Sequence, residues 1–310
     1  MQTYAALKGR ASVRLADFLH DQALQLEDVY RSGTGQGRSG WTALKRDAGL
    51  IASEAGPEED YFSRRFGDLL HVDDPWRLDV MAGIGARRGG SEAPDAKDAS
   101  GLQMLAYQID GRHDQAAGHD AFAERLSRHP DIAAELVELS GLLQARSSLG
   151  DHSVPGLEDT PLCLHAAYGA REVLTAVGWL TASRRIPFQA GVLPLSNRKC
   201  ELLFVTLDKS AGYHGRISYR DYAISVDRFH WQTQNSAGPD TPGGRRYLES
   251  SSNGWKFQLF VRARKGDAYR ACGGVTLESA DGDRPMSMVW KLETPLPARL
   301  FREFSVLRGL

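Results

Sequence analysis

The sequence predicts an α+β protein with a helical N-terminal domain and a C-terminal domain built on a curved β-sheet or barrel. The hydrophobic pattern carries this prediction, because apolar residues recur at helical spacing over residues 1–146. After Arg185 the pattern changes to alternating or short apolar runs that Gly and Pro clusters separate, which is typical of several short strands. The length of 310 residues allows two domains of ordinary size.

The N-terminal half predicts six helices, most of which begin at a residue type that favours a helix N-terminus. Serine can cap the first turn, and proline fits there because the first turn needs no backbone donor from it. Residues 85–100 lack large apolar side chains and predict a surface loop before a helix over 101–128. The other five helices are expected to start near Ser12, Ser39, Pro57, Pro75 and Pro130.

Residues 147–161 form the expected linker, so the sequence divides into domains at 1–150 and 151–310. A helix over 170–182 is expected after the linker, and a short helix over 298–307 near the end. Between these helices, strands are expected at 200–207, 221–225, 228–233, 255–264, 270–277 and 286–293.

The composition argues against a membrane protein and against several classes of enzyme. No apolar run approaches the ~20 residues of a membrane-spanning helix, and residues 1–15 lack the apolar core of a signal peptide. The three cysteines are far apart and form no CxxC pair, which favours a reducing cytoplasm and gives no sign of a zinc site. The sequence has no GxxxxGK[ST] phosphate loop and no HExxH motif. We therefore expect a cytoplasmic protein with no membrane partner, no cofactor, no metal and no catalytic residues.

Charge is distributed unevenly along the chain, although the formal net charge is only −1. Residues 160–310 contain 21 of the 38 basic and 13 of the 39 acidic residues, a balance of +8. Residues 1–159 therefore keep 17 basic and 26 acidic residues, a balance of −9. A basic C-terminal part can attract phosphate, although the two parts could instead attract each other.

Residues 216–234, RISYRDYAISVDRFHWQTQ, are the strongest indication of function. Aromatic rings lie there among arginines and carboxylates. Aromatic faces stack on nucleobases, arginines hold phosphates, and a carboxylate or amide can read a base edge. The segment therefore indicates nucleic-acid binding. The alternative is that its rings fill the core of a β-barrel, since Tyr and Trp are common in strands.

Other polar clusters give weaker signals. His113 and His119 lie near three aspartates at a spacing that could hold a metal, but a solvated loop is the more ordinary interpretation. Asp208–Lys209 follows an expected strand but lacks the intervening residue of a nuclease acid-x-lysine motif. Structural roles are expected for the histidines without a nearby nucleophile pattern, which are His152, His165, His214 and His230.

Nine segments carry a family resemblance. Six lie in the C-terminal half: LHAAYGAREVLTAVGWLT (164–181), GVLPLSNRKCELLFVTLDKS (191–210), YRDYAISVDRFHWQTQN (219–235), PDTPGGRRYL (239–248), WKFQLFVRARK (255–265) and RPMSMVWKLETPLPARL (284–300). Three lie in the N-terminal half: LADFLHDQALQLEDVY (15–30), WTALKRDAGL (41–50) and LLHVDDPWRLD (69–79). The first six resemble the C-terminal domain, long of unknown function, that follows the helicase core in many bacterial superfamily II helicases. The other three resemble the helical segment between that motor and that domain.

This resemblance implies a fold and a function. Some of these helicases also begin with a phospholipase-D-type nuclease, and they act as modification-dependent (type IV) restriction systems against foreign DNA that carries methylated cytosine. Their terminal domain is similar to the SRA (PUA-like) fold, a curved β-barrel that flips a modified cytosine into an aromatic pocket. The implied partners are double-stranded DNA with modified bases and a superfamily II helicase or nuclease, in cis or in trans. Because motor and nuclease are absent here, we expect a separately encoded reader or an excised fragment.

The residues of the expected site divide into two groups. A flipped base must be stacked and its Watson–Crick edge read, with room left for a methyl or hydroxymethyl group. Strand alternation puts Phe229 and Trp231 on one face and His230 and Gln232 on the other, so the rings cannot all face one pocket. Asp221 or Gln232 is the candidate for the base edge, since a carboxylate accepts from the cytosine amino group. The base-pocket candidates are Tyr219, Asp221, Tyr222, Phe229, Trp231 and Gln232, and the phosphate candidates are Arg198, Lys199, Lys209, Arg216, Arg220, Arg245 and Arg246.

Three other functions stay open at the level of the sequence. The protein could dock to a helicase motor as an interaction module whose aromatic segment is core, it could read another DNA modification, or it could be a nuclease with an unrecognised site. Trp179, Trp255 and Trp290 are expected to pack in the core rather than to bind a ligand.

Overall fold

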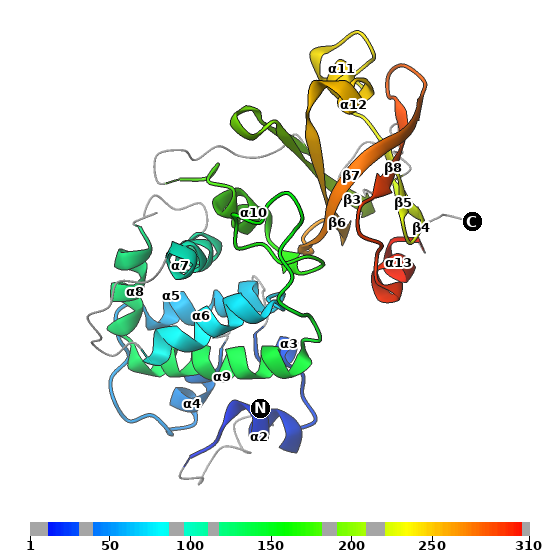
Figure 1. The fold of residues 1–310 in the computed structure, drawn as a ribbon. Coiled ribbons are helices and arrows are strands. Elements are labelled where there is room, and N and C mark those ends of the chain that lie inside the picture. Colours follow the sequence, from blue (N-terminus) through cyan, green and yellow to red (C-terminus); the bar gives the residue numbers. More distant parts are fainter. Residues whose placement is uncertain are drawn as a thin grey trace. The chain divides into compact units, whose positions relative to one another are not determined.

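The chain forms an α+β protein with two compact units (Figure 1). The first comprises residues 1–151 and 171–185 and is helical, and the second comprises residues 152–170 and 186–310 and contains the sheet. None of the described helices is long and apolar enough to cross a membrane. The computed structural model describes residues 12–30, 40–86, 96–110, 118–181, 191–208 and 221–305.

The described helices of the first unit are α2 (Leu15–Asp21), α3 (Leu26–Val29), α4 (Trp41–Asp47), α5 (Glu59–Ser63), η1 (Phe66–Leu69), α6 (Pro75–Ala86), α7 (Ala96–Asp110), α8 (His119–Ser127), α9 (Pro130–Arg146) and α10 (Ala170–Ala176). The centre of the unit is the packing of α6 against α9. Pro130 opens α9, as the sequence predicts. Buried Ile132, Leu136, Leu139 and Leu143 recur every three or four positions, so one apolar face of α9 turns toward the core.

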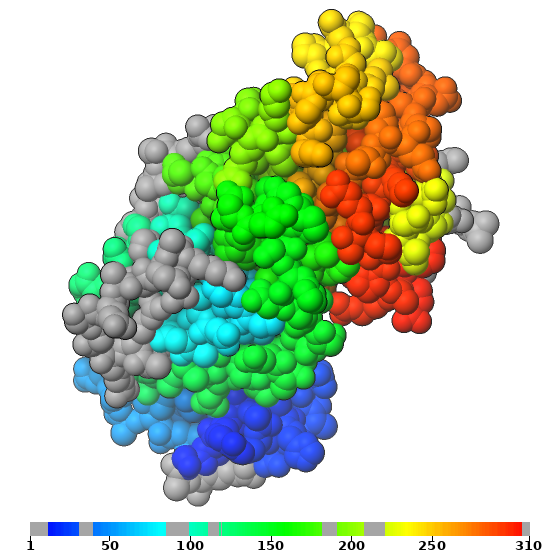
Figure 2. Space-filling model, viewed as in Figure 1, coloured from blue at the N-terminus to red at the C-terminus, as the bar shows by residue number. Residues whose placement is uncertain are grey.

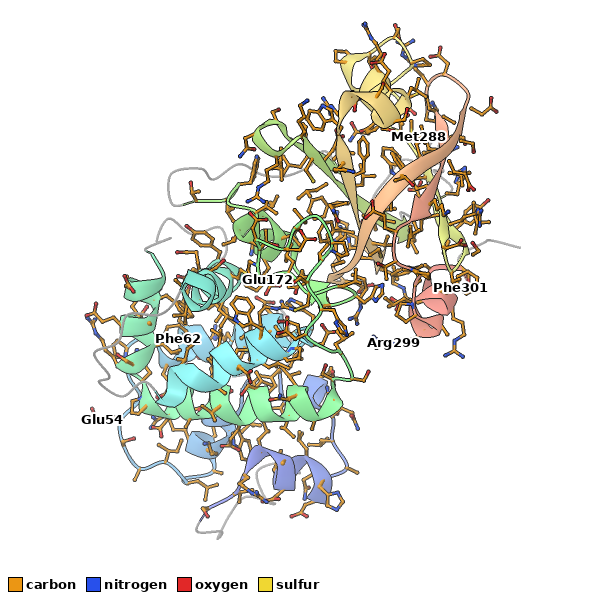
Figure 3. The ribbon with its side chains drawn as sticks, in the orientation of Figure 1. Glu54, Phe62, Glu172, Met288, Arg299 and Phe301 are labelled. Atoms are coloured by element: carbon orange, nitrogen blue, oxygen red, sulfur yellow. The ribbon has the colours of Figure 1, made fainter. Side chains whose placement is uncertain are left out.

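Buried charges hold α10 in the helical unit. Glu172 of α10, labelled in Figure 3, is fully buried, and one carboxylate oxygen accepts from Arg77 Nη1 at 2.6 Å. Its other oxygen lies 2.5 Å from His71 Nε2, and Arg77 also pairs with buried Asp74. Because an unpaired buried charge is costly, this network fixes α10 to the start of α6. Residues 171–185 therefore belong to the helical unit, although they follow the expected linker.

A second buried carboxylate fixes the start of α4. Glu135 of α9 accepts hydrogen bonds from the backbone nitrogens of Trp41 at 2.9 Å and Thr42 at 2.7 Å, which are the first two residues of that helix. Burial raises the pKa of Glu135, whereas these hydrogen bonds act in the opposite direction. The side chain thus supplies the cap that Gly40 cannot give from its own position.

The second unit is built on the described strands β1 (Ala167–Tyr168), β2 (Val192–Leu195), β3 (Cys200–Asp208), β4 (Tyr222–Ser225), β5 (Arg228–Gln232), β6 (Lys256–Arg264), β7 (Tyr269–Asp281) and β8 (Ser287–Leu292). Their order is β2-β3-β6-β7-β8-β5-β4, and β1 pairs with β7. Only β3 and β6 run parallel among these pairs. Within the described residues the sheet ends at β2 and β4 and is not closed into a barrel, so the predicted barrel is wrong there. Pro194 suits the end strand β2, because proline cannot donate to a further strand.

The sheet is strongly curved although it is open. Residues of β3 and β5 share one hydrophobic core with α13 (Ala298–Ser305), whereas four strand spacings would separate these strands by ~19 Å in a flat sheet. Irregular register in the β4–β5, β6–β7 and β7–β8 pairs adds local bending. Met288 of β8 belongs to this core and Phe301 of α13 packs against it (Figure 3). In the space-filling view α13 (red) adjoins the yellow segment that contains β4 (Figure 2).

The helices of the second half differ from the predicted ones. α10 ends at Ala176, because Gly178 takes a φ of +70°, a conformation that commonly ends a helix. The short helices α11 (Pro242–Leu248) and α12 (Ser250–Asn253) were not predicted. The signal for α11 was present, since the Thr241 hydroxyl caps it by accepting from the Gly244 nitrogen at 3.0 Å.

Candidate nucleic-acid interface

Strand β5 carries the predicted rings on opposite faces of the sheet. Phe229 is fully buried and Trp231 is 6 % exposed, and both belong to the hydrophobic core. Phe229 is paired in register with Trp290, and the Trp231 ring lies 5.5 Å from that of Tyr247, centroid to centroid. These rings are enclosed by other rings, so we withdraw their assignment as base-stacking walls. The physical reason is alternation, because the inner face of β5 must cover the core.

The outer face of the same strands presents a different set of side chains. Tyr222 of β4 and His230 of β5 are paired in register, and their rings stack with centroids 5.1 Å apart and planes 19° apart. Both residues are half-buried. The Ser287 hydroxyl of β8 lies 3.2 Å from His230 Nε2 and 3.3 Å from Gln232 Nε2, which donates to it. A ring pair thus stands beside an amide and a hydroxyl on one face of three adjacent strands.

Asp221 has a structural role at the edge of this group. The residue is buried, and one carboxylate oxygen accepts from the backbone nitrogen of Gln232 at 2.9 Å. This bond extends the pairing of β4 and β5 beyond Tyr222 and His230. The side chain of Gln232, which can both donate and accept, is half-buried on the outer face and is the better placed of the two candidates for a base edge. The outer-face cluster is defined as Tyr222, His230, Gln232 and Ser287.

Arg246 is bound to a buried carboxylate. Its guanidinium pairs with Glu201, which is 1 % exposed, and lies over the Trp255 ring at 4.4 Å from the centroid. The Tyr247 hydroxyl donates to the same carboxylate at 2.6 Å. Burial and the charge of Glu201 raise the pKa of Tyr247 well above its ordinary value. Arg246 thus has a structural role in neutralising Glu201, and its assignment as a phosphate ligand stays a prediction.

The other described phosphate candidates are exposed. Arg198 pairs with exposed Asp159 at 2.7 Å, and Arg245 donates to the carbonyl oxygen of Asp240 at 2.9 Å. Lys199 takes a φ of +46°, and its ammonium donates to the carbonyl oxygen of Asn253 at 3.4 Å. Arg198 and Lys199 therefore stand together at the turn between β2 and β3. The candidates that lie outside the described residues are Tyr219, Lys209, Arg216 and Arg220.

The described residues also show where the other chemical candidates lie. No three His, Cys, Asp or Glu side chains gather there as a metal site requires. The described cysteines form no disulfide with one another and are buried, and burial raises the pKa of Cys200 to about 11 and of Cys272 to about 12, which makes both thiols poor nucleophiles. Burial lowers the pKa of His165, and Arg270 lowers it further. His113, Asp114 and His214 lie outside the described residues.

His230 and Ser287 belong to the outer-face cluster, although neither is among the base-pocket candidates predicted from sequence. His230 was expected to be structural, and Ser287 was not singled out. The alternation of residues 228–232 already placed His230 opposite the core face, but its stacking partner depends on the register with β4. Ser287 enters only because β8 pairs with β5, 55 residues away from Gln232 in the sequence.

Fold and site together define a unit with an open curved sheet, whose inner face is apolar and whose opposite face carries polar groups and stacked rings at β4, β5 and β8. Residues 162–304, slightly under half of the chain, match the family model described as "Domain of unknown function (DUF3427)". The match begins before β1 and ends within α13, so it spans most of the sheet unit together with α10. No curated protein matches the chain.

Proposed function

We propose that the sheet unit is a DNA-binding module that recognises a modified base and serves the restriction of foreign or modified DNA. The expected modification is cytosine methylated or hydroxymethylated at C5, read after the base is flipped out of the duplex. The observation that carries the proposal is the outer-face cluster, in which the Tyr222–His230 stack stands beside the Gln232 amide and the Ser287 hydroxyl. Rings and hydrogen-bonding groups in that combination are what a flipped base requires.

The energetics limit what this cluster can do alone. Flipping costs a few kcal/mol, and one ring contact returns roughly 1–3 kcal/mol. His230 covers one face of the Tyr222 ring, so that ring can stack on a base only with its other face. A second ring is therefore needed, and Tyr219 is the remaining candidate of the original set. Phosphate contacts must supply the rest of the binding free energy.

The wider assignment follows from the resemblance. The module has no chemistry of its own in this proposal, and cutting and ATP hydrolysis belong to a superfamily II helicase or nuclease in cis or in trans. Its place of action is the cytoplasm, where foreign DNA arrives. The strong curvature of the sheet supports kinship with the SRA (PUA-like) fold, although the described sheet is open.

A binding panel tests the proposal. Fluorescence anisotropy with otherwise identical duplexes that carry cytosine, 5-methylcytosine, 5-hydroxymethylcytosine, or bulkier or backbone modifications should give tighter binding to at least one modified duplex. Equal dissociation constants across the panel at low and moderate salt would contradict recognition of a modified base. A preference for a duplex modified elsewhere than at cytosine C5 would keep the reader and change its ligand.

A second function is favoured by one observation, the acidic balance of residues 1–159. An acidic helical part can dock a basic surface on a helicase motor without any contact to DNA. This function predicts a stable complex with a helicase core and negligible DNA affinity even at low salt. Analytical ultracentrifugation of the full chain with such a core, beside the duplex panel, separates the two functions.

A further inference from the structure

Two lysines that are 35 positions apart in the sequence lie on the outer face of the sheet. Thr276 of β7 is paired in register with Lys291 of β8, and Val275 with Phe257 of β6. Lys256 precedes Phe257, so continuation of the same register sets Lys256 beside Thr276. Val275 and Phe257 belong to the inner core, and alternation therefore turns all three of the other side chains outward. Lys256, Thr276 and Lys291 are exposed.

This row leads to the outer-face cluster. Lys291 is two residues along β8 from Val289, and Val289 is the register partner of His230. Two residues of a strand span ~7 Å, and two strand spacings between Lys256 and Lys291 span ~10 Å. One DNA strand carries a phosphate for about every 3.4 Å of helix axis. A short run of consecutive phosphates can therefore contact both lysines while a neighbouring nucleotide reaches His230.

A third lysine, Lys199, lies immediately before β3, at the end of the sheet where Lys256 begins β6. The carbonyl oxygen of Lys199 accepts from the Lys256 nitrogen at 2.9 Å, which makes the two lysines neighbours. A φ of +46° is uncommon for a residue with a side chain and would suit glycine better. Lysine nevertheless occupies this position, with its ammonium held toward the α12 end by the Asn253 carbonyl. Backbone strain is often found at functional positions, so a lysine at this strained surface position is a candidate for binding an anion.

Neighbouring carboxylates already bind one of the basic side chains on this face. Arg228 of β5 lies next to Lys291 in register, but it is bound to Glu278 at 2.8 Å and to Asp227 at 3.1 Å. The Ser225 hydroxyl is the largest cause that lowers the pKa of Asp227, the Arg228 hydrogen bond is the largest for Glu278, and the charge of Lys291 lowers both pKa values further. In the described part of the chain, no carboxylate pairs with Lys199 or Lys256. Those two exposed ammonium groups can therefore pair with an incoming anion.

We propose that Lys256 and Lys291 on the outer face of the sheet, together with Lys199 at the end of the sheet beside Lys256, form a phosphate-contacting track, which holds the backbone of duplex DNA beside the Tyr222–His230 stack. This inference rests on the proposed function, and names the side of the sheet on which the DNA lies. The track contacts phosphates only, so it contributes affinity without distinguishing modified from plain DNA. Lys256 and Lys291 were not among the phosphate candidates identified from sequence.

The experiment measures the dissociation constant of the full chain for a 5-methylcytosine duplex and its plain counterpart at several salt concentrations between 50 and 200 mM. The variant Lys199→Gln/Lys256→Gln/Lys291→Gln should reduce the slope of log affinity against log salt by about 2.7, since each phosphate contact contributes ~0.9. Binding of both duplexes should weaken by the same factor. Lys265→Gln is the matched control, because Lys265 is exposed at the opposite end of β6.

Lys199→Gly separates binding from folding. Glycine accepts the +46° φ without strain, so the variant should unfold at the same urea concentration as the parent while its salt slope falls by about 0.9. An unchanged slope in this variant and in the triple variant, compared with Lys265→Gln, would overturn the track. If the parent binds both duplexes equally and the triple variant still shows the smaller salt slope, the result would support the track and contradict only modified-base recognition. No binding of the parent to either duplex at 50 mM salt would overturn both.

Discussion

The two faces of β5 and β8 differ in what their side chains can do. The inner residues Phe229, Trp231 and Trp290 are enclosed by one another and by Tyr247. The outer residues are half-buried and joined by polar contacts, with His230 as their centre. An aromatic residue in a strand is therefore no indication of a binding pocket by itself. Its face in the sheet decides whether the ring stabilises the fold or can meet a ligand.

The largest effect is expected on the inner face. Phe229→Ala should reduce the free energy of unfolding by about 3–5 kcal/mol, because it leaves a cavity in a fully packed core. Urea denaturation measures this, with Val226→Ala as the control, since Val226 is 42 % exposed and its truncation should change little. A stable Phe229→Ala protein that has lost its preference for modified DNA would contradict the division between the faces.

A comparable loss is expected when the buried carboxylate loses its arginine. Arg246→Ala should destabilise the protein by about 3 kcal/mol, because Glu201 stays buried without its partner. Arg245→Ala, one position earlier and exposed, should change stability by less than ~0.5 kcal/mol. Adding Glu201→Gln to Arg246→Ala should recover part of the loss. If Arg246→Ala unfolds like the parent but binds all DNA more weakly, Arg246 is a phosphate ligand after all.

On the outer face the expected effect falls on binding instead of stability. Tyr222→Ala should weaken the preference for modified DNA by roughly 1–3 kcal/mol, about 5- to 150-fold, because one stacking surface is removed. Tyr222→Phe keeps the ring and should retain the preference. The ratio of dissociation constants for modified and plain duplexes measures the effect. A parent-like ratio in Tyr222→Ala would remove the outer-face cluster from the proposed pocket.

The smallest effect concerns the exposed acid beside the lysine track. Glu278→Gln should leave the unfolding transition unchanged, because its pair with Arg228 is exposed and screened by water. Affinity for modified and plain duplexes should rise slightly and equally, since a negative charge near Lys291 is removed. Ser279→Ala, on the same strand, is the uncharged control. Weaker binding in Glu278→Gln would speak against phosphates on this face.

Much of the fold was predictable from local pattern. The change of hydrophobic period after Arg185 gave an α+β protein, and Pro130 marked the start of α9. The closed barrel was wrong because closure depends on pairing between β2 and β4, and no local pattern records whether two distant strands meet. The place of α10 was equally hidden, since its buried Glu172 meets Arg77 only in the tertiary structure.

For the candidate site, the amino-acid sequence alone determined which residue types were present and which alternated along residues 228–232. Alternation follows from the geometry of a single strand, so it can be read without a partner. Tertiary structure alone decided which of the two sets faced the core, bound Arg246 to Glu201, and set Lys256 and Lys291 on the same face as His230. These are contacts between segments tens of residues apart, and their register is fixed by the packing of the whole sheet.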